Sequence, residues 1–81
     1  MRCEVLLFAQ LAEEVGGERL TVDLPDGATA ADALAALAGD HAPIERMREV
    51  LAIAVNERYC DGGRALNDGD TIALIPPISG G

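Results

Sequence analysis

The chain has 81 residues, of which 49% are hydrophobic and 25% are charged, so its length and composition fit one small globular domain. Fourteen Asp and Glu residues outnumber six Arg residues, no Lys is present, and the formal net charge is -8. This acidic balance disfavours a nucleic-acid partner, because binding to a phosphate backbone depends on basic side chains.

Membrane insertion, secretion and structural disulfides are also disfavoured. No apolar run approaches the roughly 18 to 20 residues that cross a bilayer, and the apolar stretch 5–9 is flanked by glutamates, which argues against a signal peptide. Cys3 and Cys60 lie far apart and form no CxxC pair, so their spacing supports neither a disulfide scaffold nor a zinc site. We expect a reduced, cytoplasmic protein with no membrane partner and no bound metal.

The first third of the chain predicts two strands separated by a short helix. Residues 2–8 (RCEVLLF) carry branched apolar side chains on both sides of an alternating pattern, which is typical of a strand. Residues 9–15 (AQLAEEV) are good helix formers and end at Gly16 and Gly17, where a positive φ is favourable. Residues 18–24 (ERLTVDL) alternate between apolar and polar and predict a half-buried strand.

A main helix follows a turn at residues 25–27 (PDG). Thr29 and Asp32 have the spacing of a capping box, with Asp in place of the usual Glu, and so predict the start of the helix. The helix is expected to run over residues 30–38 and to end at Gly39. Its buried stripe would consist of Ala33, Leu34 and Leu37.

The remaining elements are an ambiguous segment and the later strands. Residues 40–49 are mixed in character, and a helical turn there would align Ile44, Met47 and Val50. Residues 51–55 (LAIAV) and 71–75 (TIALI) predict strands, the second of which ends at a Pro-Pro pair, and residues 58–60 predict a short edge strand. Four or five strands with one main helix, in this order, indicate an α+β fold in which a mixed sheet packs on the helix.

Strand alternation divides the apolar residues between the two faces of this sheet. Most of them would face the main helix, and the opposite face would carry Leu6, Phe8, Ala52, Ala54, Ala73 and Ile75. If the first and last strands are parallel neighbours, this face forms a smooth apolar patch beside the C-terminal segment. Exposed patches of this kind mark binding surfaces. The alternative is that the short helix or a loop covers Phe8 or Ile75.

The side chains offer no convincing catalytic site. His41 is the only histidine, and without a second histidine or a matching cysteine it is expected to be an exposed loop residue. Cys3 and Cys60 are interpreted as ordinary buried or half-buried thiols. The carboxylates are dispersed through turns and helix ends, and neither internal Gly-Gly pair belongs to a phosphate-binding pattern.

The C-terminus is the most distinctive candidate for chemistry. After a domain spanning residues 1–77, residues 78–81 (ISGG) would form a flexible tail, because the Pro-Pro pair favours an extended exit from the last strand. Two consecutive glycines would fit a channel that a side chain would block. The ionised carboxylate of Gly81 could attack the α-phosphate of ATP to form an acyl adenylate. The alternative is an inert, frayed end.

Three segments carry a resemblance to a known family: residues 5–16 (VLLFAQLAEEVG), 51–56 (LAIAVN) and, most specifically, 66–81 (LNDGDTIALIPPISGG). They resemble the ubiquitin-like β-grasp sulfur carriers that serve as the small subunit of molybdopterin synthase, and the resemblance covers the whole chain. In the last segment the DGD turn, the apolar strand, the Pro-Pro pair and the terminal Gly-Gly follow the order and spacing of the family. Ile75 departs from it, since the family often has an aromatic residue before the Pro-Pro pair.

The resemblance implies a ubiquitin-like β-grasp fold and a sulfur-carrier function. It implies that an E1-like enzyme uses ATP to adenylate Gly81, that Gly81 becomes a thiocarboxylate, and that its sulfur passes to cyclic pyranopterin monophosphate to build molybdopterin. Sulfur would be the cargo, and no cofactor would be bound permanently. The chain would not be an enzyme by itself, because the catalytic residues are expected on the large subunit.

The resemblance also implies two kinds of contact with partners. The segment that threads into the large synthase subunit would consist of Pro77, Ile78, Ser79 and Gly80. The docking surface, shared by the large subunit and the E1-like enzyme, would consist of Phe8, Leu6, Ala73 and Ile75. The family further implies a heterotetramer with two large subunits.

Other functions remain open on the same sequence. A carrier of the same fold could deliver sulfur to the thiazole of thiamine or to a tRNA uridine. A ubiquitin-like modifier would use the same adenylate with an amine acceptor, and the absence of Lys precludes lysine-linked chains of this protein alone. A binding module with an inert tail is a third class. A β-grasp ferredoxin is excluded, because two cysteines cannot supply four thiolate ligands.

Overall fold

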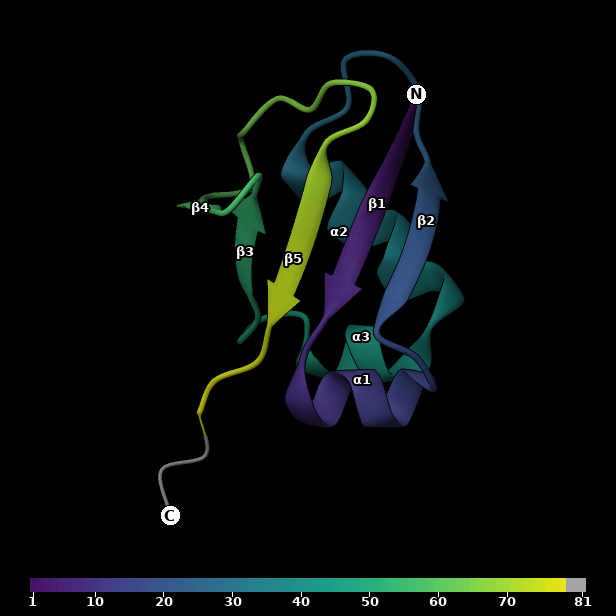
Figure 1. The fold of residues 1–81 in the computed structure, drawn as a ribbon, viewed down its shortest axis with the longest axis vertical. Helices are drawn as coiled ribbons and strands as arrows, with labels where there is room; N and C mark the ends of the chain where they lie inside the picture. Colours follow the sequence, from purple (N-terminus) through teal and green to yellow (C-terminus); the bar gives the residue numbers. More distant parts are fainter. Residues whose placement is uncertain (79–81) are drawn as a thin grey trace.

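The computed structural model describes residues 1–78 as a five-stranded sheet with three helices (Figure 1). In chain order the elements are β1 (Arg2–Leu7), α1 (Ala9–Val15), β2 (Arg19–Asp23), α2 (Ala30–Asp40), α3 (Ala42–Met47), β3 (Ala52–Val55), β4 (Arg58–Cys60) and β5 (Thr71–Ile75). The α+β class and the short edge strand are thereby confirmed. Within this described part, the helices are all too short or too polar to span a membrane.

The sheet is mixed, with the strand order β2-β1-β5-β3-β4. β1 and β5 are parallel, whereas the pairs β1–β2, β3–β5 and β3–β4 are antiparallel. Figure 1 looks onto one face of the sheet, with α2 behind it and α1 at the lower end, toward which β1 and β5 both point. Because β1 and β5 are parallel neighbours, the segments that follow them leave the sheet at the same end.

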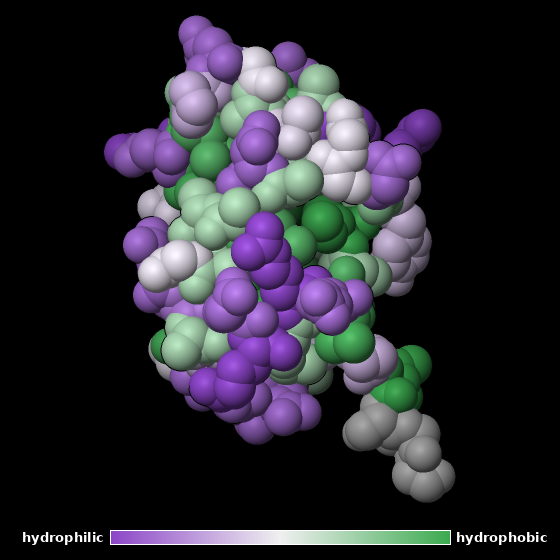
Figure 2. Space-filling model, turned by 180° about the vertical axis from the view of Figure 1, so that it is seen from behind, coloured by the Kyte–Doolittle hydropathy of each residue, from purple (hydrophilic) through white to green (hydrophobic). Residues whose placement is uncertain are grey.

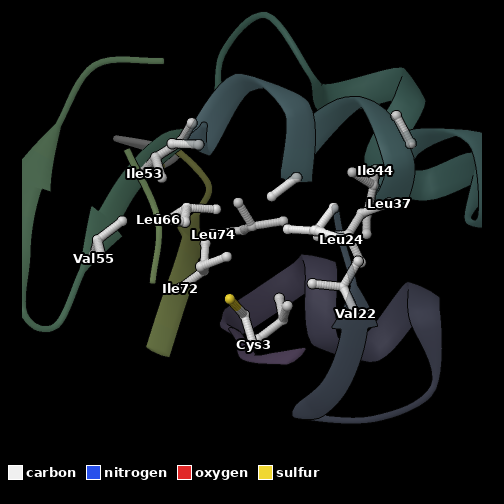
Figure 3. Packing of buried hydrophobic residues seen from close by; sticks show 14 of the residues in the cluster. Cys3, Val22, Leu24, Leu37, Ile44, Ile53, Val55, Leu66, Ile72 and Leu74 are labelled. Atoms are coloured by element: carbon white, nitrogen blue, oxygen red, sulfur yellow. The ribbon is translucent and has the colours of Figure 1, made fainter. Parts of the chain in front are cut away.

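The hydrophobic core lies between the sheet and the helices. Val5 on β1 and Ile72 and Leu74 on β5 are at most 1% exposed, and Figure 3 shows the side chains from β5, β2 and α2 gathered in one interior. Leu37 of α2 is 2% exposed and belongs to the same cluster. The strand residues predicted to face the main helix are buried, apart from two that are only half-buried, Leu20 and Leu51.

The N-terminus of α2 is capped by the chain itself. The predicted capping box is present: the hydroxyl oxygen of Thr29 accepts from the N–H of Asp32 (3.3 Å), whose carboxylate accepts from the N–H of Thr29 (2.9 Å). The N–H of Ala31 donates to the carbonyl of Gly62 (2.9 Å). A Cβ at Gly62 would lie 2.9 Å from the Cβ of Ala31, so glycine allows this close approach. The first backbone N–H groups of α2 are therefore already hydrogen-bonded to other parts of the chain.

The prediction that the main helix ends at Gly39 is wrong. α2 continues to Asp40, and its cap residue is His41, whose N–H donates to the carbonyl of Leu37 (2.9 Å). A glycine ends a helix where it adopts a positive φ. Gly16 does so at the end of α1, with φ 95°, as predicted, whereas Gly39 does not.

The segment after α2, which was ambiguous in the sequence, contains α3. Proline lies in its first turn, where the missing N–H costs nothing, and Ile44 is fully buried. Met47 packs against the core, but Val50 is 58% exposed, so the predicted alignment of Val50 with them is wrong because the helix ends first. Arg46 forms an ion pair with Glu14 of α1 (2.6 Å), which joins the two short helices.

Candidate functional site

One row of outward-facing side chains crosses all five strands on the sheet face opposite α2. The strand register places Tyr59 opposite Ala54, Ala54 opposite Ala73, Ala73 opposite Leu6, and Leu6 opposite Arg19. Neighbouring strands are about 4.8 Å apart, so the two alanines leave a gap roughly two strands wide between the larger side chains of Tyr59 and Leu6.

The alanine pair forms the floor of an apolar hollow of about 240 Å³. The hollow is lined by Leu6, Phe8, Ala54, Glu57, Tyr59, Thr71, Ala73 and Ile75. The face is apolar, as predicted. The prediction of a smooth patch is wrong, because large side chains flank the small ones across the paired strands and leave a hollow between them. The opposite side of the molecule, formed by the helices, carries many hydrophilic residues (Figure 2).

Phe8 reaches this face because its extended backbone continues the alternation of β1 for one more residue before α1 begins. It is extended (φ -126°, ψ 153°), and its carbonyl accepts from the N–H groups of Leu11 (3.1 Å) and Ala12 (3.3 Å) in the first turn of α1. Ala9 then adopts φ 51°, in the left-handed region that is costly for a residue with a Cβ. The side chain of Phe8 is left 44% exposed, so Phe8 is not covered, whereas Ile75 is half-buried.

The C-terminal segment leaves the sheet beside Phe8. Pro76 is buried, which anchors the exit, Pro77 is exposed, and Ile78 is 94% exposed. A second surface depression, of about 330 Å³, lies between the start of α1 and this segment and is lined by Ala9, Gln10, Ile75, Pro76, Pro77 and Ile78. Ser79, Gly80 and Gly81 lie outside the described residues, so their predicted roles stay predictions.

A hydrogen-bonded turn fixes the wall of the hollow that contains Tyr59. Asn56 and Glu57 adopt φ 51° and 69° between β3 and β4, as in a type I′ turn. The side chain of Asn56 donates to Oδ1 of Asp70 (2.9 Å) and accepts from the N–H of Thr71 (3.0 Å). The turn is therefore attached to the beginning of β5.

Asp70 is the only charged or polar residue among the buried positions of the described chain. Its Oδ2 accepts from the N–H of Asn67 (2.8 Å). This bond, followed by the bond from Asn56, lowers the pKa of the Asp70 carboxyl below its ordinary value. Asp70 is therefore a structural carboxylate that holds two turns in place.

Three residues that line the hollow were not predicted from the sequence to lie on this face: Glu57, Tyr59 and Thr71. Tyr59 is 74% exposed and is the largest side chain of the hollow. A signal was present: a two-residue turn after Val55 places Tyr59 opposite Ala54 on the outward face. Without the turn type, the register of the edge strand could not be assigned.

The remaining candidates behave as ordinary structural residues. Cys3 is fully buried, and desolvation, followed by the charge of Asp70, raises the pKa of its thiol. Cys60 is half-buried on β4. His41 is half-buried at the junction of α2 and α3, which corrects the expectation of an exposed loop residue. Over residues 1–78, no group of three or more metal-ligating side chains is found.

The five-stranded mixed sheet around one main helix defines a protein of the ubiquitin-like β-grasp class, as predicted. The chain belongs to the ThiS family, whose family model matches residues 5–81.

Known relatives match over the full length. A molybdopterin synthase sulfur carrier subunit from Chlamydomonas reinhardtii is 37% identical, with 100% of both chains covered. Small archaeal modifier protein 1 from Haloferax volcanii is 37% identical, and its crystal structure matches with a TM-score of 0.90 over 100% of both chains. A chain in the complex of subunits 1 and 2 of molybdopterin-converting factor from Helicobacter pylori is 29% identical, with a TM-score of 0.72 over 100% of both chains. The resemblance to the molybdopterin synthase family is thus confirmed.

Proposed function

We propose that this chain is the sulfur carrier subunit of a molybdopterin synthase, in which Gly81 carries the sulfur. One observation carries this proposal: relatives with that function align over the whole chain, and the family match continues through Gly81. The geometry of the described residues supports it, because the apolar hollow extends along β5 as far as Ile75, and the C-terminal segment leaves the sheet at the next residue.

The proposed chemistry takes place at the carboxylate of Gly81. One carboxylate oxygen attacks the α-phosphate of ATP in an E1-like enzyme, pyrophosphate leaves, and an acyl adenylate forms. A sulfide-level nucleophile then attacks the acyl carbon, a C–S bond forms, and AMP leaves with the oxygen. The resulting thiocarboxylate delivers its sulfur to cyclic pyranopterin monophosphate, on residues supplied by the large subunit. The chain is thus a sulfur donor and not a catalyst by itself.

Two parts of the chain are proposed to contact the partners: the apolar sheet face and the C-terminal segment. Leu6, Phe8, Ala73 and Ile75 contact the large subunit or the E1-like enzyme, each in turn. Pro77, Ile78, Ser79 and Gly80 then thread Gly81 into the partner's active site. Ile78 supports this role, since a large apolar side chain that is 94% exposed gains the most from burial by a partner. Two such chains with two large subunits would form the heterotetramer.

The test is the intact mass of the protein after incubation with ATP, the E1-like enzyme and a sulfide source. We expect an increase equal to replacement of one oxygen by sulfur, and no increase in a variant lacking Gly81 or extended by one residue after it. Normal loading of the extended variant would overturn the proposal. The loaded protein, mixed with the large subunit and the pterin precursor, should then yield molybdopterin; loading without this product would indicate a different acceptor.

A second candidate function is that of a protein modifier. It is favoured by the full-length similarity to small archaeal modifier protein 1. In that case the acyl carbon of Gly81 would be attacked by an amine of another protein, and AMP or the sulfur group would leave. Tryptic mass spectrometry of cell extracts distinguishes the two functions, because only the modifier leaves its C-terminal residues attached to lysines of other proteins.

A further inference from the structure

We infer that the hollow above Ala54 and Ala73 receives one large apolar side chain that projects from the docking partner, with a basic group of the partner beside Glu57. The inference rests on the proposed function, because the partners concerned are the large synthase subunit and the E1-like enzyme. It adds the shape and charge that each of those partners must present to this face.

The shape of the hollow favours a side chain over a free metabolite. Its volume of about 240 Å³ is below the roughly 300 to 1,000 Å³ typical of small-molecule sites. Its floor is two alanine methyl groups, and its walls are Tyr59 and Leu6, so the interior offers apolar contacts and few groups that could orient a polar ligand.

A flat partner surface would leave this hollow empty. The cores of protein interfaces pack as densely as protein interiors, because an unfilled gap loses dispersion contacts on both sides. The partner must therefore project an aliphatic or aromatic side chain between Tyr59 and Leu6. Such anchors in desolvated pockets are the residues that usually dominate binding energy.

The charge at the rim is negative. Glu57 is the only charged residue that lines the hollow, and it is exposed. Arg19, at the far end of the same cross-strand row, is already engaged in an ion pair with Glu4. A basic side chain next to the projecting apolar residue would complement Glu57 and would speed association with a chain of net charge -8.

The hollow also lies next to the start of the C-terminal segment. Ala73 and Ile75 lie on the same face of β5, and Ile75 is followed directly by the buried Pro76. A side chain seated above Ala54 and Ala73 therefore sets the partner's position relative to Ile75 and to the start of the threading segment.

The test uses larger apolar side chains at Ala73, which fill the hollow and keep the face apolar. Ala73 is half-exposed, so Ala73→Leu and the smaller Ala73→Val should fold, and valine is also favoured in strands. We expect Ala73→Leu to raise the Kd for the large subunit and for the E1-like enzyme by at least about tenfold, and Ala73→Val by less, because excess methylene groups in a packed site are excluded. Ala35→Leu adds the same atoms on the exposed side of α2 and should leave both Kd values unchanged.

Titration calorimetry measures the Kd of each variant for both partners, and each outcome supports or overturns the inference. Wild-type affinity of both Ala73 variants, with unchanged circular dichroism, would overturn the inference while leaving the proposed function intact. An equal loss in Ala35→Leu would also overturn it, since the effect would not be local to the hollow. Failure of the wild-type chain to bind either partner would defeat the proposed function, and this inference with it. Glu57→Lys should slow association; an unchanged association rate would remove the basic group from the inference.

Discussion

The side-chain amide of Asn56 donates a 2.9 Å hydrogen bond to Oδ1 of Asp70 and so joins the β3–β4 turn to the start of β5. The two residues are fourteen positions apart in the sequence, and β5 lies beside β3 in the sheet. Because Tyr59 follows this turn on the outward face, the bond helps to hold one wall of the hollow in position.

Asp70→Asn should destabilise the protein in a pH-dependent way. The pKa of Asp70 is lowered in the folded state, so its contribution to stability is present above its unfolded pKa of about 3.9 and is lost as the pH falls through the folded value. We expect the variant to lose about 1 to 3 kcal/mol of unfolding free energy at pH 7, because the N–H of Asn67 or the amide of Asn56 loses an acceptor.

Urea unfolding at a series of pH values measures this effect. The difference between the wild type and Asp70→Asn should shrink as the pH falls below about 4, because the unfolded chain then binds a proton at Asp70 while the folded carboxylate, with its lowered pKa, is still ionised. Asp40→Asn, at the exposed end of α2, is the matched control and should change stability by no more than about 0.5 kcal/mol. A difference that stays constant down to pH 3 would show that the charge of Asp70 does not contribute.

Gly39→Ala should stabilise the protein by about 0.5 to 1 kcal/mol, because Gly39 lies inside α2 and a Cβ there would contact nothing within 4 Å. Gly16→Ala is the opposite case, since Gly16 has φ 95° and the substitution should cost about 1 kcal/mol or more. Thermal unfolding distinguishes the two. Destabilisation by Gly39→Ala would indicate that α2 ends at Gly39 instead of continuing to Asp40.

Phe8→Arg should weaken binding to the large synthase subunit by at least about tenfold, because a charge would replace an apolar side chain on the proposed docking face. Val50→Arg is the control: Val50 is also exposed, but it follows α3 and does not line the hollow. Calorimetry on both variants measures the effect. Equal affinity for Phe8→Arg and the wild type would show that the partner docks elsewhere.

The two thiols should react at different rates in the folded protein. Cys60 is half-buried on the edge strand, whereas Cys3 is fully buried with a raised pKa, so its thiolate is both scarce and inaccessible. We expect a thiol reagent at pH 8 to label Cys60 first and to label Cys3 only after unfolding. Peptide mass mapping identifies the labelled site, and early labelling of Cys3 would mean that the β1 region opens readily.

Much of the fold could be predicted because its signals are local. The capping box at Thr29, the glycine that ends α1 and the alternation of the strands each depend on residues within a few positions of one another. The same is true of the Pro-Pro pair and of the terminal Gly-Gly, which carry the family resemblance. For this reason the sequence alone indicated the β-grasp class and the candidate role of Gly81.

Tertiary structure decided what depends on residues that are distant in the chain. α2 passes through Gly39 because its last turn joins α3, which buries Ile44 in the core. The hollow exists because strand pairing brings Ala54 beside Ala73. Which residues are neighbours across the sheet cannot be known from the sequence until the strand register is known. The sequence by itself determined which residues are apolar and where strands begin; only the packing of strands against one another determined that the apolar face is hollow and which residues form its walls.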